Sequence, residues 1–386
     1  METNFSSGDV PPPLAPPPVI TAPPQKPRKS RGWMIFALIL LVLLCFSLFG
    51  NFAQAISRAL TLPGSFDRGF RPRALREAGP RLDEVILKDN GSRNKIAVVT
   101  VDGIITSHQT DQAGNSMVDV IRAQLDRASE DSRVKAVILK VDSPGGEVMA
   151  SDQINKLFVK FQDESRKPVI CSMGSLAASG GYYISAPSRW IVADDLTITG
   201  SIGVIMHGYN YRGLMDKIGL APNTYKSGKF KDMLSGDRAT NDIPAEEHAM
   251  VQGLIDETYQ KFKSVVRDGR GAAYKANTQA KGDKGKELAS DWESYADGRV
   301  LSGTQALKLG FVDQLGDFDD AVDRARKITG IQTADLIEYR ERYDLANLFG
   351  MFGQSGKASD VKIDLGLDLP KLQANAMYFL WEAPAN

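Results

Sequence analysis

The fold is decided by the stretch Val169-Ile-Cys-Ser-Met-Gly-Ser-Leu-Ala-Ala-Ser-Gly-Gly-Tyr-Tyr183. Its first three residues are an apolar run that predicts a buried strand, and small residues follow it up to Ser179 and Gly180. A strand, a tight turn, a serine and the start of a helix form the layout of an exposed nucleophile. Glycine and serine are also common in ordinary turns, so the pattern alone leaves a purely structural turn open.

Strands and helices alternate before this stretch. Residues 96–101 and 134–141 are β-branched, apolar runs that predict buried strands. Apolar residues recur at helical spacing after each of these strands: Met117, Val120, Ile121, Leu125 and Ala128, then Ile154, Leu157, Phe158 and Phe161. We therefore expect an α/β fold in which crossover helices connect the strands of a parallel sheet.

Two glycine-rich turns follow successive predicted strands. Residues 144–146 come after the strand 134–141, and residues 179–181 come after the strand that starts at Val169. Binding and catalytic groups gather at the carboxyl ends of parallel strands. Glycine reaches backbone conformations closed to other residues, so Gly145 and Gly146 are candidate oxyanion donors opposite the serine. A plain connection between strand and helix explains the same residues equally well.

A nucleophilic serine needs a base, and histidine is scarce: the chain has only His108, His207 and His248. His207 is the most reasonable histidine partner. The alternative is a lysine that burial keeps neutral, because desolvation lowers an amine pKa from about 10.4 by several units. Three lysines lie together, Lys226, Lys229 and Lys231, and their spacing does not choose among them. Such a cluster is usually a solvated face.

Composition limits the other possible classes. The chain has 386 residues and no net charge, so nothing indicates a nucleic-acid partner. Neither a metal site nor a cofactor is expected, because no group of His, Cys and carboxylates has metal-ligand spacing. Cys45 lies in an apolar run and Cys171 in a predicted buried strand, so we expect no disulfide between them.

The N-terminal region predicts a disordered arm followed by a membrane anchor. Residues 1–31 are rich in proline, and residues 33–49 are uncharged and nearly all apolar, which is just long enough to span a bilayer. Basic residues flank the run on both sides, so charge alone leaves its orientation close to a tie. Ala53-Gln-Ala55 resembles a signal-peptidase site, but the long preceding arm favours an uncleaved anchor that contacts lipid through residues 33–53.

Five motifs in this order resemble the signal peptide peptidase A family of serine peptidases, of the short, single-repeat bacterial type. They are Asp142-Ser-Pro-Gly-Gly146, Met173-Gly-Ser-Leu-Ala-Ala-Ser-Gly-Gly-Tyr-Tyr-Ile-Ser185, Thr199-Gly-Ser-Ile-Gly-Val-Ile-Met206, Lys226-Ser-Gly-Lys-Phe-Lys-Asp232 and Ala296-Asp-Gly-Arg-Val300. The resemblance extends from about residue 95 to about residue 330. It implies a ClpP/crotonase-like fold with parallel sheets and crossover helices, preceded by one transmembrane helix.

The resemblance also implies roles for individual residues. Ser179 matches the nucleophile and Lys231 the general base of a Ser-Lys dyad. Ser201 matches a serine that orients the lysine, and Gly145 and, less directly, Gly180 match the oxyanion donors. It further implies a homo-oligomer and apolar peptide substrates such as remnant signal peptides. The peptidase domain would lie on the extracytoplasmic side of the inner, cytoplasmic membrane, held by a single span.

We therefore expect a disordered arm (1–31), an anchor (32–56), a linker and lead-in (57–94), a peptidase domain (95–330) and a C-terminal extension (331–386). Within the domain, residues 272–286 are polar and predict an exposed insertion. Beyond it, the weakly alternating residues 351–386 predict a tail that packs on a neighbour. Two other classes stay open: a crotonase-type acyl-CoA enzyme, which shares the fold, and an inactive membrane scaffold.

Overall fold

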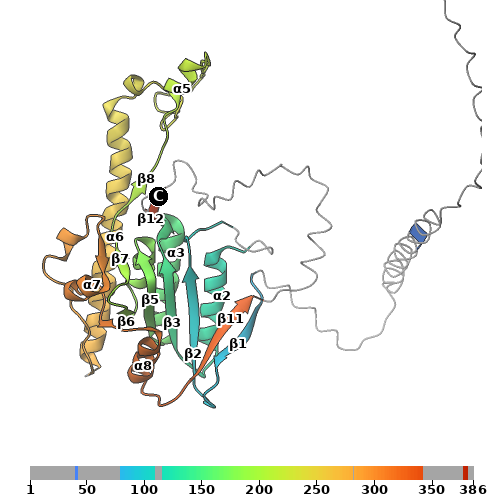
Figure 1. Ribbon diagram of the computed structural model, residues 1–386, viewed down its shortest axis with the longest axis vertical. Coiled ribbons are helices and arrows are strands. Elements are labelled where there is room, and N and C mark those ends of the chain that lie inside the picture. Colours follow the sequence, from blue (N-terminus) through green and yellow to red (C-terminus); the bar gives the residue numbers. More distant parts are fainter. Residues whose placement is uncertain (1–39, 42–78, 109–114, 281, 342–376, 381–386) are drawn as a thin grey trace, which may run out of the picture. The chain divides into compact units, whose positions relative to one another are not determined.

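The computed structural model describes residues 40–41, 79–108, 115–280, 282–341 and 377–380 (Figure 1). The chain divides into two units, residues 1–76 and residues 77–386. Of the first unit, only the helical residues Leu40 and Leu41 are described, so the predicted arm and nearly all of the predicted anchor lie outside the described residues. Among the residues that are described, no helix has both the length and the apolar character that crossing a membrane requires.

Nine strands of the described residues form one mostly parallel sheet in the second unit. Its order is β1-β11-β2-β3-β5-β6-β10, with β7 paired to β5 and β9 paired to β7. Only the pairs β1–β11 and β7–β9 are antiparallel. The strands are β1 (Leu82–Lys88), β2 (Lys95–Asp102), β3 (Val134–Ser143), β5 (Val169–Ala178), β6 (Trp190–Ala193), β7 (Ile198–Gly200), β9 (Val300–Ser302), β10 (Gln314–Leu315) and β11 (Asp335–Glu341).

The predicted α/β class and parallel sheet are confirmed, and they fit a ClpP-like fold. Sequence analysis found only the first three residues of β5. The strand continues to Ala178 because it changes partners: residues 170–172 pair with β6, whereas residues 176–178 pair with β7. This second half is made of small residues, which carry little of the β-branched signal that marks a strand.

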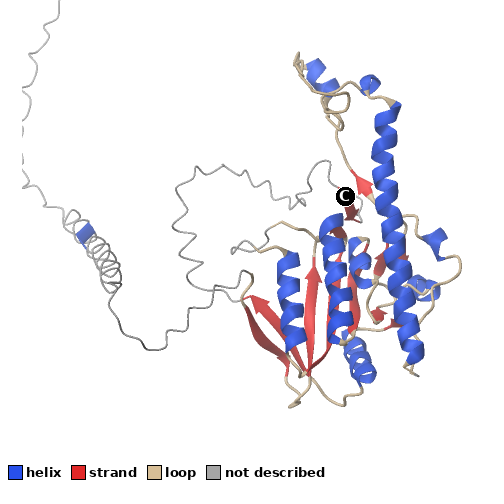
Figure 2. Ribbon diagram, turned by 180° about the vertical axis from the view of Figure 1, so that it is seen from behind, coloured by secondary structure: helices blue, strands red, loops and turns tan. Residues whose placement is uncertain are grey.

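Helices cover both faces of the sheet (Figures 1 and 2). Alternate residues of β3 point to opposite faces, so Val137 and Leu139 join one core and Ala136 and Ile138 the other. Side chains of α2, α3, α4 and α6 fill the first core, and α8 covers the second. The helices are α2 (Met117–Glu130), α3 (Val148–Ser165), α4 (Gly180–Ser185), α5 (Arg212–Lys217), α6 (Ala245–Gln279), α7 (Gly303–Leu309) and α8 (Phe318–Thr329), with short 3₁₀ turns at Thr240–Asp242 and Trp292–Tyr295.

A second, three-stranded sheet has the order β4-β12-β8. Its strands are β4 (Gly145–Glu147), β8 (Ile205–Met206) and β12 (Met377–Leu380), and β12 is antiparallel to both neighbours. The C-terminal segment therefore returns to the first glycine-rich turn, which lies in β4. Residues 342–376 and 381–386 of the predicted tail lie outside the described residues.

The boundaries of the folded region differ from those expected for residues 95–330. β1 precedes this range and β11 follows it, yet both belong to the main sheet. The prediction of an exposed insertion over 272–286 is wrong for its first half, because Ala273 and Asn277 are buried in α6. The polar residues around them hid the helical face that packs on the domain.

Candidate active site

Ser179 lies at the junction of β5 and α4 and is only 1% exposed. Its backbone has φ 53° and ψ −116°, a conformation that residues other than glycine rarely adopt. Two hydrogen bonds hold it there: the Ser179 N–H donates to the Gly200 carbonyl, and the Tyr183 N–H donates to the Ser179 carbonyl, both at 2.8 Å. The Ser179 hydroxyl has no hydrogen-bond partner among the described residues, so it is available to a substrate.

Ser201 directly follows β7, the strand that pairs with the end of β5. β5 and β7 are parallel, with Ala178 opposite Gly200, so each serine comes one residue after this last pair. Ser201 also has a positive φ, 50°, and its N–H donates to the Arg299 carbonyl at 2.8 Å. The predicted pairing of the two serines in one site is thus consistent with the register of the sheet.

The glycine turn of β4 packs directly against the turn of Ser179. A Cβ added at Gly180 would lie 3.0 Å from the Gly145 Cα, 3.0 Å from the Gly146 nitrogen and 2.7 Å from the Ser151 Oγ. Gly145 has φ 101°, and its N–H donates to the Ser143 Oγ at 3.1 Å. As an oxyanion donor, Gly145 would have to exchange this hydrogen bond for one to the substrate.

Two buried tyrosines fix α4, the helix that begins directly after Ser179. The Tyr182 hydroxyl donates to the Phe311 carbonyl at 2.9 Å, and the Tyr183 hydroxyl donates to Asp152 at 2.8 Å. Tyr182 and Tyr183 also make edge-to-face contacts with Phe311 and Phe262, respectively. Burial raises the pKa of both phenols, so they stay neutral and act as structural supports.

Lys231 is exposed, in the segment between α5 and α6. Figure 1 shows α5 beyond the end of α6 that points away from the sheet. The neighbouring lysines are engaged: Lys226 pairs with Asp232 at 2.8 Å, and Lys229 pairs with Glu246. The Lys231 ammonium has no such partner among the described residues. Within one chain, the site therefore contains Ser179, Ser201 and the two glycines, but it lacks Lys231.

Neither histidine nor cysteine replaces the lysine at this turn. Where the chain is described, no histidine hydrogen-bonds to Ser179, and His108 instead contacts Thr106 and Glu147. Cys171 lies within the core, and burial raises the pKa of its thiol to about 12, so it stays protonated and unreactive. No group of three or more potential metal ligands is found in the described part of the chain.

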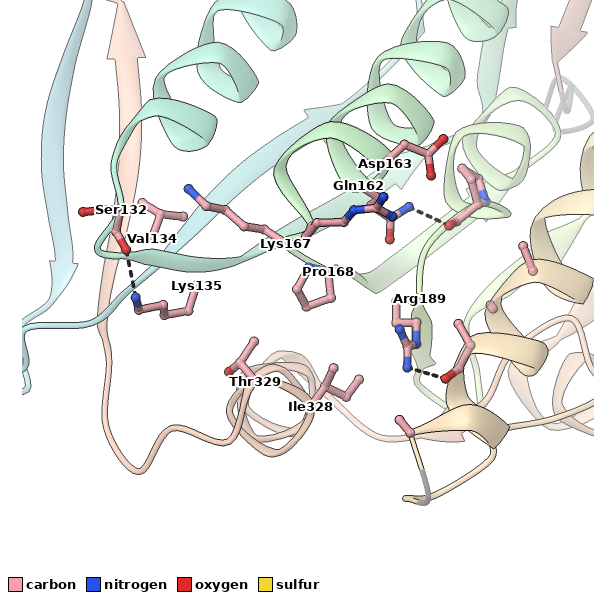
Figure 3. Close-up of a pocket in the computed structure, with 16 residues that line it drawn as sticks. Ser132, Val134, Lys135, Gln162, Asp163, Lys167, Pro168, Arg189, Ile328 and Thr329 are labelled. Carbon is pink, nitrogen blue, oxygen red and sulfur yellow. Dashed lines mark hydrogen bonds between the residues drawn. The ribbon is translucent and has the colours of Figure 1, made fainter.

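A cavity of about 710 Å³ lies at the other end of the strands, where Val134 begins β3 and Pro168 precedes β5 (Figure 3). Two of its cations, Lys167 and Arg189, already have partners in the protein. Lys167 donates to three backbone carbonyls at the end of α2, and Arg189 donates to the Ala276 carbonyl and to Asn277. The cavity is lined by none of the predicted site residues, so it is separate from the serine site.

The chain is similar to known peptidases over the region that contains Ser179. The model of peptidase family S49 matches residues 161–332. A putative signal peptide peptidase SppA of Enterococcus faecium is 37% identical over 267 residues, which span 67% of this chain and 71% of that protein. The chain belongs to peptidase family S49. As a member of the signal peptide peptidase A group in this family, it is a serine peptidase.

Two further relatives agree with this assignment. A putative protease of Synechocystis is 38% identical and is matched over 62% of this chain and 76% of that protein. Protease 4 of Haemophilus influenzae is 36% identical, and the match covers 61% of this chain but only 35% of that longer protein. The family resemblance given by the five motifs is therefore confirmed.

Sequence reasoning missed one element of this S49 site, the strand β12 beside β4. Its only signal was the short apolar run Met377-Tyr-Phe-Leu380 near the C-terminus. Four residues cannot specify a distant strand partner, because register depends on the edge that receives the strand. The structure also distinguishes the three lysines, which their spacing in the sequence could not do. Lys226 and Lys229 pair with carboxylates, whereas Lys231 does not.

Proposed function

We propose that this chain is a membrane-anchored serine endopeptidase that degrades cleaved signal peptides and other apolar peptides. Ser179 is the nucleophile, and Lys231 of a neighbouring copy is the general base. The proposal rests on two features found in the same chain. Ser179 is buried and strained and has a free hydroxyl, and Lys231 is exposed and has no carboxylate partner among the described residues. The names of the relatives support the substrate class.

The reaction needs a neutral amine next to the Ser179 hydroxyl. The amine takes the serine proton as the oxygen attacks the peptide carbonyl, and the resulting ammonium protonates the leaving amine. Ser201 orients the amine from the neighbouring strand. The N–H groups of Gly180 and Gly145 stabilise the oxyanion, the latter after leaving Ser143. Water activated by the same amine then releases the acyl group.

The lysine has to arrive from a second copy because a lysine in water stays protonated and cannot act as a base. In a single chain Lys231 is exposed. Docking this segment over Ser179 of an adjacent subunit would remove water from the amine. A closed homo-oligomer repeats that contact at every interface. It also surrounds the sites with an inner surface suited to extended apolar peptides.

The proposed location follows from the sequence at the N-terminus. The uncharged run 33–49 is just long enough to span a bilayer and would hold the protein in the inner, cytoplasmic membrane as a single span through residues 33–53. The peptidase domain would then face the extracytoplasmic side, where released signal peptides leave the bilayer. Neither the crotonase-type activity nor the inactive scaffold is favoured, because the S49 model matches residues 161–332, which include Ser179 and Lys231, and the relatives are named as peptidases or proteases.

Fluorophosphonate labelling of the full-length protein in detergent, followed by peptide mapping, tests this function. We expect the label on Ser179, cleavage of an apolar signal peptide, and loss of both in Ser179→Ala. Lys231→Met should abolish cleavage, whereas the matched control Lys229→Met should retain it, since Lys229 already pairs with Glu246. Label on another residue, or normal cleavage by Lys231→Met, would remove the dyad from the mechanism.

A further inference from the structure

The carboxylate of Glu147 receives several contacts from one short segment, residues 105–108. The Ser107 N–H and hydroxyl donate to its Oε2 at 2.8 and 2.5 Å, and the Thr106 hydroxyl donates to its Oε1 at 3.0 Å. The His108 Nδ1 lies 2.8 Å from the same Oε1. The Glu147 side chain is only 14% exposed. Both carboxylate oxygens are therefore engaged by the protein.

Glu147 directly follows the glycine turn and is the N-cap residue of α3. A capping side chain would accept a hydrogen bond from the first N–H groups of the helix, but the Glu147 carboxylate makes no such bond. Its hydrogen bonds go to segment 105–108 instead. Burial alone would raise the pKa of Glu147, but hydrogen bonds from Ser107 and Thr106 and the nearby His108 outweigh burial and lower it. The group that joins the two segments is thus a carboxylate, ionised at neutral pH.

The same segment holds the backbone of the glycine turn. The Ile105 N–H donates to the Gly145 carbonyl at 2.9 Å, and the Glu147 N–H donates to the Ile105 carbonyl at 2.8 Å. Ile105 and Gly146 form a parallel bridge, and a Cβ on Gly146 would lie 1.9 Å from the Ile105 carbonyl oxygen. Ile105 is fully buried. The position of segment 105–108 therefore sets the position of the turn.

The bond from Ile105 also fixes the plane of the peptide between Gly145 and Gly146. This peptide is trans, so its N–H points opposite to its carbonyl, and the Gly146 N–H faces away from Ile105. The Gly146 nitrogen lies 3.0 Å from the position of a Cβ on Gly180, the residue after Ser179. Rotation of this peptide would change the face that the turn presents to the serine.

We propose that Glu147 is a positioning residue for the reaction: its carboxylate clamps segment 105–108 against the glycine turn and so holds the turn beside Ser179. The proposal rests on the peptidase function proposed above. Beyond Ile105, the segment is held through Thr106 and Ser107, whose donors meet at Glu147. Glu147 acts through the turn and not by contact with the substrate.

The first test compares the natural full-length chain in detergent with Glu147→Ala and Glu147→Gln. Misplacing a catalytic group by about 1 Å can cost about 100-fold in rate, so a turn that is only loosened should cost about tenfold in kcat. We expect this loss in Glu147→Ala, with KM for an apolar peptide changed less than about twofold and fluorophosphonate labelling of Ser179 slowed in parallel.

Glu147→Gln should retain at least about half of the natural kcat, because its amide oxygen accepts from the Ser107 N–H and its amide nitrogen donates to the Thr106 oxygen. Glu164→Ala is the matched control. It changes the same residue type at the other end of α3, where the side chain is 67% exposed, and should behave as the natural chain. Natural kcat in Glu147→Ala, or an equal loss in Glu147→Gln, would overturn the proposal.

A double-mutant cycle separates the clamp from a general loss of stability. Thr106→Val combined with Ser107→Ala removes the donor side chains from the other segment, at positions less buried than Glu147 is. Since both changes remove the same contacts, adding Glu147→Ala to this pair should lower kcat by less than about twofold more. Losses that multiply would contradict the clamp. If Glu147→Ala folds poorly, the segment variant alone should still show the tenfold loss in kcat, and natural kcat in that variant would refute the clamp.

Hydrogen exchange decides even if the peptidase function fails, in which case no form cleaves peptide or labels Ser179. The N–H groups of Ile105 and Glu147 are both bonded between the segment and the turn. Mass spectrometry should show faster exchange in residues 103–108 and 143–148 of Glu147→Ala than in the natural chain and Glu164→Ala. Equal exchange rates in all three would refute the clamp.

Discussion

At the scale of single residues, the site depends on backbone positions that resist substitution. Ser179 and Ser201 both have positive φ, which costs a residue other than glycine on the order of 1 kcal/mol or more. At Ser179, hydrogen bonds on both sides of the residue maintain this conformation. At Gly146, a Cβ would lie 1.9 Å from the Ile105 carbonyl oxygen, so only glycine fits. These constraints fix the position of Ser179, the proposed nucleophile, before any substrate binds.

Gly180→Ala should disable the site and leave the fold intact. The new methyl group would press on Gly145, Gly146 and Ser151, and so move the glycine turn away from the nucleophile. We expect kcat/KM to fall on the order of 100-fold, the usual effect of losing an oxyanion donor. The control is Gly271→Ala in α6, where a Cβ meets nothing within 4 Å. It should keep its activity and gain up to about 1 kcal/mol of stability.

Asp131 should make stability depend on pH in the acid range. Partial burial alone would raise its pKa, but hydrogen bonds from Arg133 and Lys95 outweigh burial and lower the pKa from 3.8 to about 2. A lowered folded-state pKa stabilises the protein above pH 3.8, and this contribution is lost as the pH falls towards 2. Urea titrations should show Asp131→Asn less stable than the natural chain at pH 7 and equal to it near pH 2. A constant difference across this range would refute the assignment.

At the residue level, the sequence is most informative where a reactive residue type and a turn signal occur at the same position. A strand followed by Ser-Gly-Gly predicts an exposed nucleophile at Ser179, and the structure places this residue between β5 and α4 with a positive φ. Lys231 could not be separated from Lys226 and Lys229 by spacing, because the difference lies in the carboxylates that the fold brings to the other two.

At the scale of elements, the long helix α6 is fastened to the domain by a buried ion pair. Arg270 and Asp313 contact each other at 2.5 Å, and Arg270 is 1% exposed. Arg270 also donates to the Ser188 carbonyl at 3.2 Å, and Asp313 accepts from the Ile191 and Lys286 N–H groups at 2.9 Å. Arg270 thus connects α6 to the loop at Ser188 directly, and through Asp313 to β6 and to the loop at Lys286.

Arg270→Ala should therefore be strongly destabilising, by about 3–5 kcal/mol, because it leaves the Asp313 carboxylate buried without its cation. Arg267→Ala, less than one turn earlier, is the matched control. Its side chain is 53% exposed and pairs with Glu293 at the surface, so its loss should cost at most about 1 kcal/mol. Chemical denaturation measures both. Equal losses would mean that the buried pair does not fasten the helix.

Strands were predicted correctly where an apolar run marks them in the sequence. They were missed where only pairing with a neighbouring strand makes a segment extended. The apolar runs in β2 and β3 were recognised because they are buried on both faces. The second half of β5, the three residues of β4 and the four of β12 were not recognised, because they become strands only through the neighbours that the fold supplies.

At the scale of the whole molecule, one chain supplies an incomplete site. Ser179, Ser201 and the glycine turn lie together, while Lys231 extends into solvent on the segment before α6. The strand β12 further occupies the border of the site. We propose that assembly completes the site by supplying the base from a neighbouring copy.

Complementation between two inactive variants tests this account most directly. Ser179→Ala retains Lys231, and Lys231→Met retains Ser179, so neither chain alone should cleave an apolar peptide. After the two are mixed and reassembled, roughly a quarter of interfaces pair an intact serine with an intact lysine, and cleavage should return to about that fraction of the natural activity. Mixing Lys231→Met with the double variant should restore nothing. Mixed oligomers that form, as seen by native mass spectrometry, yet stay inactive would contradict the claim that a neighbouring copy supplies the lysine.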